Sequence, residues 1–86
     1  MTTIITLPNQ KTSIKWTSYL LTAYAEGFCE GENATIEEQM EAWAGLIKTG
    51  LCYNLQGWFG RTATQLINKG LISKEGKIDW DLIESK

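Results

Sequence analysis

The chain has 86 residues, 43% of them hydrophobic, and a formal net charge of -2 at pH 7. This length predicts one small domain over residues 1–86, and the weakly negative charge argues against a protein whose main role is to coat nucleic acid or an anionic membrane. The sequence has neither a basic leader followed by an apolar run nor a stretch of about 18 apolar residues, so we expect a cytoplasmic protein with no membrane partner.

The N-terminal residues predict an extended arm, because Pro8 removes a backbone donor and disfavours helix at the residue before it. A first helix is predicted over residues 13–26, beginning at Thr12 or Ser13 as N-cap and ending at Gly27. Its apolar side chains recur three and four residues apart, as on one face of a helix: Trp16, Tyr19, Leu20, Ala23 and Tyr24.

A second helix is predicted over residues 35–49. Thr35 and Glu38 have the spacing of a capping box, in which each side chain accepts a hydrogen bond from the other residue's backbone amide. We expect Glu37 and Glu41 on the solvated side of this helix, with Glu38. Its apolar face consists of Ile36, Met40, Trp43, Leu46 and Ile47.

Two similar segments end the second and third helices. Residues 46–51 and 66–71 each place two aliphatic and two polar residues before Gly and Leu. Gly50 and Gly70 are therefore predicted to take positive φ just past a helix, where glycine has no Cβ penalty. The third helix is predicted over residues 59–69.

The C-terminal part of the sequence predicts less regular structure. Residues 71–78 indicate a turn or two-stranded ribbon around Glu75 and Gly76, and Asp79 is placed to cap a last short helix. The expected fold class is all-α: a compact bundle of three main short helices, an extended N-terminal arm, and a short ribbon with a helix at the C-terminus.

A glycine-flanked aromatic pair lies between the second and third helices. Two glycines three residues apart disfavour a helix interior by about 1 kcal/mol each, so we expect a break there. If Phe59 enters the core, Trp58 is left partly exposed, and exposed Trp beside Arg is typical of a protein-contact hot spot. The predicted partner-binding residues are Gln56, Gly57, Trp58, Gly60 and Arg61. The alternative is structural: Trp58 packs against Tyr53 or the N-terminal arm, and Arg61 contacts a carboxylate.

Nucleic acid is a second class of partner, favoured less than protein. Every charged residue between Lys15 and Lys48 is acidic. From Lys48 to Lys77, all charged residues except Glu75 are basic. A winged helix-turn-helix reading takes residues 61–69 as the recognition helix and 71–78 as the wing. The polar groups offered to a groove would be those of Arg61, Thr62, Thr64, Gln65 and Asn68.

A clamp of the KH type is a weaker form of the nucleic-acid hypothesis. It would use the Gly-x-x-Gly turn at Gly57 and Gly60 to hold a sugar-phosphate backbone. The two residues inside the turn, Trp58 and Phe59, argue against it, because such a clamp favours small or cationic residues there.

Catalysis and cofactor binding have the least support in the sequence. There is no His, and Cys29 and Cys52 do not form a CxxC motif, so we expect no metal site, no cofactor and no disulfide framework. An acid-base mechanism would need a buried carboxylate, thiol or amine with a shifted pKa. We therefore expect a protein that is not an enzyme.

The segment from Thr49 to Gly70 has the pattern Thr-Gly-Leu-x-x-x-Leu-Gln-Gly-x-x-Gly-Arg-x-Ala-x-x-Leu-Ile-x-x-Gly. With the Glu-rich capped helix before it, this pattern resembles a family of small, uncharacterised tailed-bacteriophage proteins, over residues 35–72. The resemblance transfers no activity. It implies a phage accessory protein of short helices that acts in the cytoplasm of a bacterial host.

These observations predict a small phage accessory protein that acts without catalysis. It would bind another protein, from the host or the phage, or assemble with copies of itself as a homo-oligomer.

Overall fold

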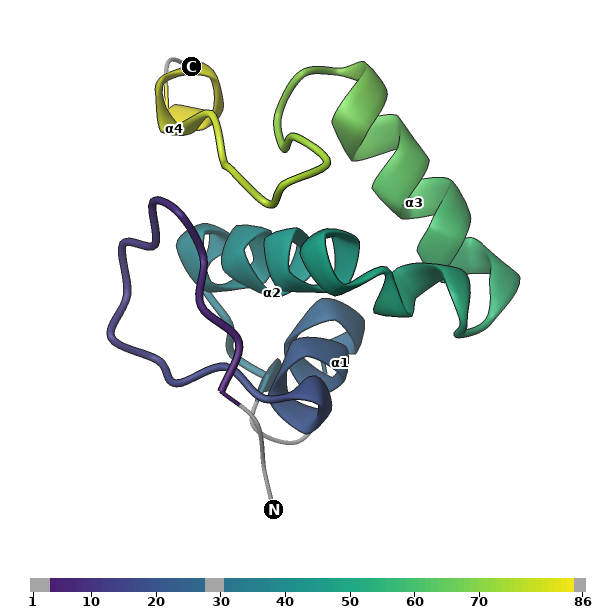
Figure 1. Cartoon of the computed structure of the whole chain (residues 1–86). Helices are drawn as coiled ribbons and strands as arrows, with labels where there is room; N and C mark the ends of the chain where they lie inside the picture. The colour runs from purple at the N-terminus through teal and green to yellow at the C-terminus, as the bar shows by residue number, and fades with distance from the viewer. Residues whose placement is uncertain (1–3, 28–30, 85–86) are drawn as a thin grey trace.

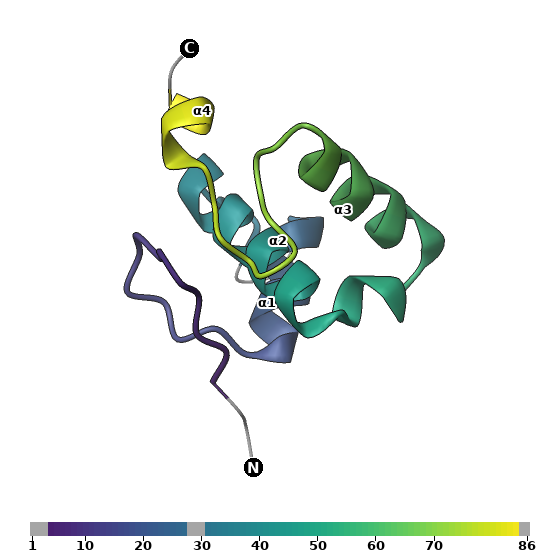
Figure 2. The same cartoon turned by 45° about the horizontal axis from the view of Figure 1, so that its top comes forward.

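The computed structural model describes residues 4–27 and 31–84. It contains the helices α1 (Ser18–Glu26), α2 (Ile36–Thr49), α3 (Gly57–Asn68) and α4 (Trp80–Glu84), with a 3-10 turn, η2 (Leu51–Tyr53), between α2 and α3. α2 lies in the middle, with α1 along one side and α3 and α4 on the other (Figure 1, Figure 2). The only β pairings within these two ranges are isolated antiparallel bridges. The predicted fold, three main helices with a short C-terminal helix, is confirmed.

α1 begins five residues later than predicted. Its N-cap is Thr17, whose hydroxyl accepts from the Leu20 amide at 3.3 Å. Trp16 is still extended, because the amide of Ile5 donates to its carbonyl at 2.8 Å. The predicted range 13–26 was therefore wrong at its start, while the predicted end at Gly27 is confirmed by a φ of 76°.

α2 follows its sequence signals closely at both ends. Both hydrogen bonds of the predicted capping box are present between Thr35 and Glu38, and Gly50 ends the helix with a φ of 75°. Gly45 lets α1 approach α2, since a Cβ at this position would lie 2.4 Å from Cδ2 of Leu21. Most of the buried core side chains come from α2 or pack against it: Trp16, Leu21, Trp43, Leu46, Ile47, Phe59, Ile72 and Ile78.

The prediction that Glu41 is solvated was wrong. Its side chain is 0% exposed. It points from α2 toward the N-terminal arm, where backbone and side-chain donors take the place of water. Periodicity did not reveal this, because a buried Glu has the same spacing as an exposed one.

The predicted helix break at the glycine pair was wrong: α3 begins at Gly57, two residues before the predicted start, and both glycines lie in its first turns. The chain leaves the helical path earlier, between α2 and α3, where the 3-10 turn η2 follows Gly50. The end of α3 is as predicted: the Gly70 amide donates to the Ile67 carbonyl at 3.0 Å and the Leu71 amide to that of Leu66 at 3.1 Å. This is the hydrogen-bond pattern of a Schellman cap.

The chain between α3 and α4 forms the predicted ribbon. Ile72 and Ile78 make its antiparallel bridge, and both are 1% exposed. Gly76 turns the chain with a φ of 84° and is packed against α2, since a Cβ there would lie 3.0 Å from the Ala44 carbonyl oxygen. Asp79 caps α4 by accepting from the Leu82 amide at 3.0 Å.

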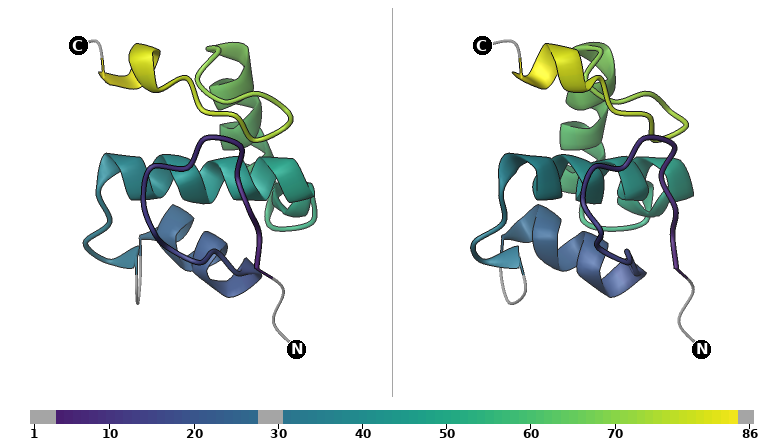
Figure 3. Two further views of the ribbon diagram at one scale, coloured as in Figure 1. Left: turned by 60° about the vertical axis from the view of Figure 1, so that its left-hand side comes forward. Right: turned by 90° about the vertical axis from the view of Figure 1, so that its left-hand side faces the viewer.

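The N-terminal arm crosses α2 and joins it to the C-terminal segment (Figure 3). The side chain of Asn9 pairs with the backbone of Ile78. Nδ2 of Asn9 donates to the Ile78 carbonyl at 2.6 Å, and the Ile78 amide donates to Oδ1 of Asn9 at 3.0 Å. Trp80 Nε1 donates to the carbonyl of Asn9 at 2.8 Å. Lys11 forms an ion pair with Glu84. The arm therefore fixes where α4 lies.

Candidate functional site

The aromatic pair at the start of α3 is split between core and surface. Phe59 is 2% exposed, whereas Gln56 and Arg61 are exposed. Trp58 is half-buried: its ring stacks on Phe59 with centroids 4.0 Å apart and meets Trp43 of α2 edge-on at 6.1 Å. Trp58 therefore packs toward α2, and not against Tyr53 or the arm as the structural alternative had it.

Gln56 belongs to the same side of the helix start as Trp58. Its Oε1 accepts from Trp58 Nε1 at 3.3 Å. The two side chains thus form one polar-aromatic corner at the junction of η2 and α3. Of the predicted partner-binding residues, the remaining three lie together on a different face.

A shallow groove of about 480 Å³ runs along the outer face of α3. We call it the α3 groove; it is lined by Tyr53, Gly57, Gly60, Arg61, Thr64 and Gln65. Because glycine has no side chain, Gly57 and Gly60 leave the helix backbone accessible at the bottom of the groove. A Cβ at Gly57 would lie 3.2 Å from Nη1 of Arg61, and one at Gly60 would lie 3.7 Å from Cδ1 of Tyr53.

The α3 groove lies in a stretch of chain without acidic residues. Between Glu41 and Glu75 the charged residues are Lys48, Arg61, Lys69 and Lys74. The one ion pair of residues 4–27 and 31–84 joins Lys11 to Glu84, so no described carboxylate pairs with Arg61. The predicted structural role for Arg61, contact with a carboxylate, has no partner among these residues.

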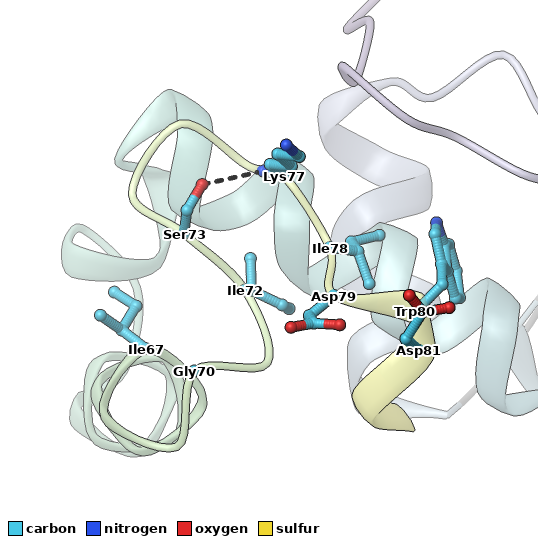
Figure 4. A pocket seen from close by; sticks show the side chains of 9 residues that line it. All are labelled: Ile67, Gly70, Ile72, Ser73, Lys77, Ile78, Asp79, Trp80 and Asp81. Atoms are coloured by element: carbon cyan, nitrogen blue, oxygen red, sulfur yellow. Dashed lines mark hydrogen bonds between the residues drawn. The ribbon is translucent and has the colours of Figure 1, made fainter. Parts of the chain in front are cut away.

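Sequence reasoning missed a second hollow, a pocket of about 690 Å³ between the end of α3, the ribbon and the start of α4 (Figure 4). We call it the C-terminal pocket; it is lined by Ile67, Gly70, Ile72, Ser73, Lys77, Ile78, Asp79, Trp80 and Asp81. Its residues were assigned to the right elements. The space between those elements depends on Asn9, which no local pattern connects to Ile78.

Both hollows are lined by a mixture of polar, charged and apolar residues. No group of three or more His, Cys, Asp or Glu side chains lies close enough to hold a metal ion among the residues placed by the structure. Burial raises the pKa of the Cys52 thiol, which favours its protonated form. Cys29 lies outside the described residues.

Across the same two ranges, none of the helices is long and apolar enough to cross a membrane.

Comparison with known proteins places the chain in a family without giving it an activity. No curated protein matches it. No solved structure matches it either. The model of a family described as a domain of unknown function, DUF7417, matches residues 22–85, from within α1 through α4. Since that match covers most of the chain, the protein belongs to the DUF7417 family.

Proposed function

We propose that the protein acts without catalysis, by binding another protein through the α3 groove. The observation that carries this proposal is that Arg61 and Tyr53, whose side chain is 58% exposed, line the same groove over two glycines. Arg and Tyr are enriched in the few interface residues that dominate binding energy. A low glycine floor gives a partner access to both side chains.

The backbone of the groove is supported by a packed aromatic base, which favours binding. Trp58 stacks on Phe59, and Trp43 of α2 meets the two rings edge-on and tilted. A partner would therefore order the exposed side chains of the groove without having to order the helix that carries them.

The charge around the groove indicates the kind of partner. Arg61 has no acidic neighbour in sequence for many residues on either side. An unpaired guanidinium prefers a carboxylate, with which it forms two parallel hydrogen bonds. We therefore propose a protein partner with an acidic contact surface. The phage resemblance places the pair, in this proposal, in the cytoplasm of an infected bacterium, where the partner comes from the host or the phage.

Duplex DNA is the second candidate, because Arg61, Thr64, Gln65 and Asn68 are all exposed along α3. The geometry of the ribbon gives this candidate less support. Gly76 is buried against α2, so the turn does not extend beyond α3 in the way that a DNA-contacting wing does. A gel-shift assay with duplex DNA at low salt tests it, and an unshifted band rules it out.

Quantitative affinity capture from bacterial lysate tests the protein-binding proposal. The wild type, Arg61→Ala and Lys15→Ala are compared as bait, with Lys15 as an exposed cation far from α3. We expect a captured protein to be lost with Arg61→Ala and kept with Lys15→Ala. Equal capture by all three baits contradicts a role for the α3 groove.

A further inference from the structure

The C-terminal pocket combines an aliphatic floor with an excess of negative charge. Of the three isoleucines on its floor, the half-buried Ile67 supplies the accessible aliphatic surface, since Ile72 and Ile78 are each 1% exposed. Asp79 and Asp81 supply carboxylates. Figure 4 shows the Asp79 side chain between the chain around Gly70 and α4. Lys77 is the one cation in the lining, so the lining residues sum to a charge of -1.

The end of α3 also faces the pocket. Gly70 lines the pocket just past the last turn, at the negative end of the helix dipole, where the Leu66 and Ile67 carbonyls already accept capping hydrogen bonds. Neither Asp79 nor Asp81 has an ion-pair partner within the described ranges, where Lys11 with Glu84 is the sole pair. The pocket is therefore suited to a cationic side chain beside an apolar group.

The α3 groove offers that combination on the same molecule. Arg61 is exposed and unpaired among the described residues, and the Tyr53 ring lies beside it. Arg61 lies nine residues before Gly70, about 13 Å along the axis of α3 at 1.5 Å per residue, and it lines the groove but not the pocket of its own copy. Figure 1 shows the start of α3 beside η2 and its end beside the ribbon.

We propose that the C-terminal pocket of one copy of this chain receives Arg61 and Tyr53 from the α3 groove of a second copy. The Arg61 guanidinium forms hydrogen bonds with Asp81, and the Tyr53 ring packs against the aliphatic floor. This inference rests on the proposed function only in its use of the α3 groove.

A single contact of this kind leaves one groove and one pocket free. These either meet each other in a two-fold dimer or bind further copies in a ring or filament. Because the paired charges are partly exposed, salt weakens the contact. We therefore expect an average mass that rises with protein concentration and falls with added salt.

Sedimentation velocity on the full chain tests this expectation directly. The wild type is run across a concentration series at about 0.05 M and about 0.5 M salt, where the screening lengths differ by a factor of about three. Concentration-dependent association at low salt supports the proposal. A monomer at every concentration overturns it, while lysate capture by the α3 groove still decides the proposed function separately.

Charge reversal identifies the two surfaces. Arg61→Glu and Asp81→Arg, each alone, place like charges across the contact, and we expect both variants to stay monomeric. An equimolar mixture restores opposite charges at both kinds of junction, so we expect association to return. Lys15→Glu makes the same change in net charge as Arg61→Glu and should associate like the wild type.

Three results overturn the proposed contact: association of either single variant, a mixture that stays monomeric, or loss of association in Lys15→Glu. Circular dichroism shows whether each variant is folded. If Asp81→Arg is unfolded, Asp81→Asn takes its place, and it must raise the concentration needed for association by at least threefold.

Discussion

The buried carboxylate of Glu41 accepts a hydrogen bond from the hydroxyl of Thr12 at 2.5 Å. Trp16 Nε1 donates to this same oxygen, Oε1, at 3.1 Å, and the amides of Lys11 and Thr12 donate to Oε2 at 2.7 and 2.8 Å. A lone buried carboxylate costs several kcal/mol, whereas one with this many donors is satisfied without a cation. Glu41 thus fastens the N-terminal arm to α2.

Replacing Glu41 by Gln should destabilise the fold. The amide group of Gln presents two hydrogens to donors that have no acceptor to offer, and the charge-assisted bonds are lost. We expect the free energy of unfolding to fall by about 2 to 4 kcal/mol, measured by urea denaturation. Glu37→Gln, one turn earlier and half-exposed, should change it by less than about 0.5 kcal/mol. A loss no larger than that for Glu41→Gln would contradict this role.

Replacing Asn9 by Ala should loosen the C-terminal segment before the rest of the fold. The Ile78 amide loses its acceptor and its carbonyl loses a donor. We expect a loss of about 1 to 3 kcal/mol, with the largest change in amide hydrogen exchange at Ile78. Asn33→Ala, at an exposed position, is the control. Unchanged exchange at Ile78 would mean that other contacts hold this segment.

Trp58 and Arg61 should respond differently to truncation. Trp58→Ala removes the stack on Phe59 and the contact with Trp43, so we expect unfolding to become easier by about 2 kcal/mol. Arg61→Ala removes an exposed side chain and should change stability by less than about 0.5 kcal/mol. Thermal unfolding of the two variants distinguishes these roles. If both variants are equally stable, Trp58 has no structural role, and only its predicted role in partner binding remains.

Alanine substitutions at two glycines with positive φ distinguish the cost of backbone strain from that of a steric clash. Gly27 has a φ of 76° with nothing within 4 Å of its missing Cβ, whereas at Gly76 the Ala44 oxygen would lie 3.0 Å away. Gly27→Ala should cost about 1 kcal/mol from backbone strain alone. Gly76→Ala should cost about 2 kcal/mol or more, because α2 must also move. The free energy of unfolding is measured by urea denaturation. Equal losses for the two variants would show that the ribbon moves away from α2 at no cost.

The thiol of Cys52 should react slowly until the protein unfolds. Burial raises its pKa, so the reactive thiolate is scarcer in the folded state. Because the folded pKa is raised, the stability that this group contributes is complete below its unfolded pKa and is lost as pH rises through the folded value. A Cys29→Ser variant isolates the signal in a thiol-labelling assay. Labelling as fast as that of the urea-unfolded chain would contradict the burial.

The local parts of this fold were readable in the sequence. The capping box of Thr35 and the ends at Gly50 and Gly70 depend on neighbours within one turn, and all three are confirmed. Gly57 and Gly60 were singled out because glycine pairs disfavour helix, and that expectation was wrong, since both lie inside α3. They line one groove with Arg61 and Tyr53 because the helix continues through them.

The long-range parts were not readable. Glu41 finds its donors 25 to 30 residues away, and Asn9 meets Ile78 across 69 residues. The contact of Thr12 with Glu41 also explains the error at the start of α1. The Thr12 hydroxyl donates to Glu41, and Thr17 caps the helix instead. The C-terminal pocket depends on Asn9, which holds Ile78 and so places α4. Short-range signals therefore predicted the cap at Asp79 but not the pocket beside it.

The pairing of Asn9 with Ile78 also has a consequence for synthesis. The arm leaves the ribosome early, yet the backbone that its amide group recognises is made 69 residues later. Glu41 is translated well before that, and it can already gather the arm onto α2 while the rest of the chain is still being made. The contact of the arm with Glu41 can therefore form before the contact with Ile78, which needs almost the whole chain.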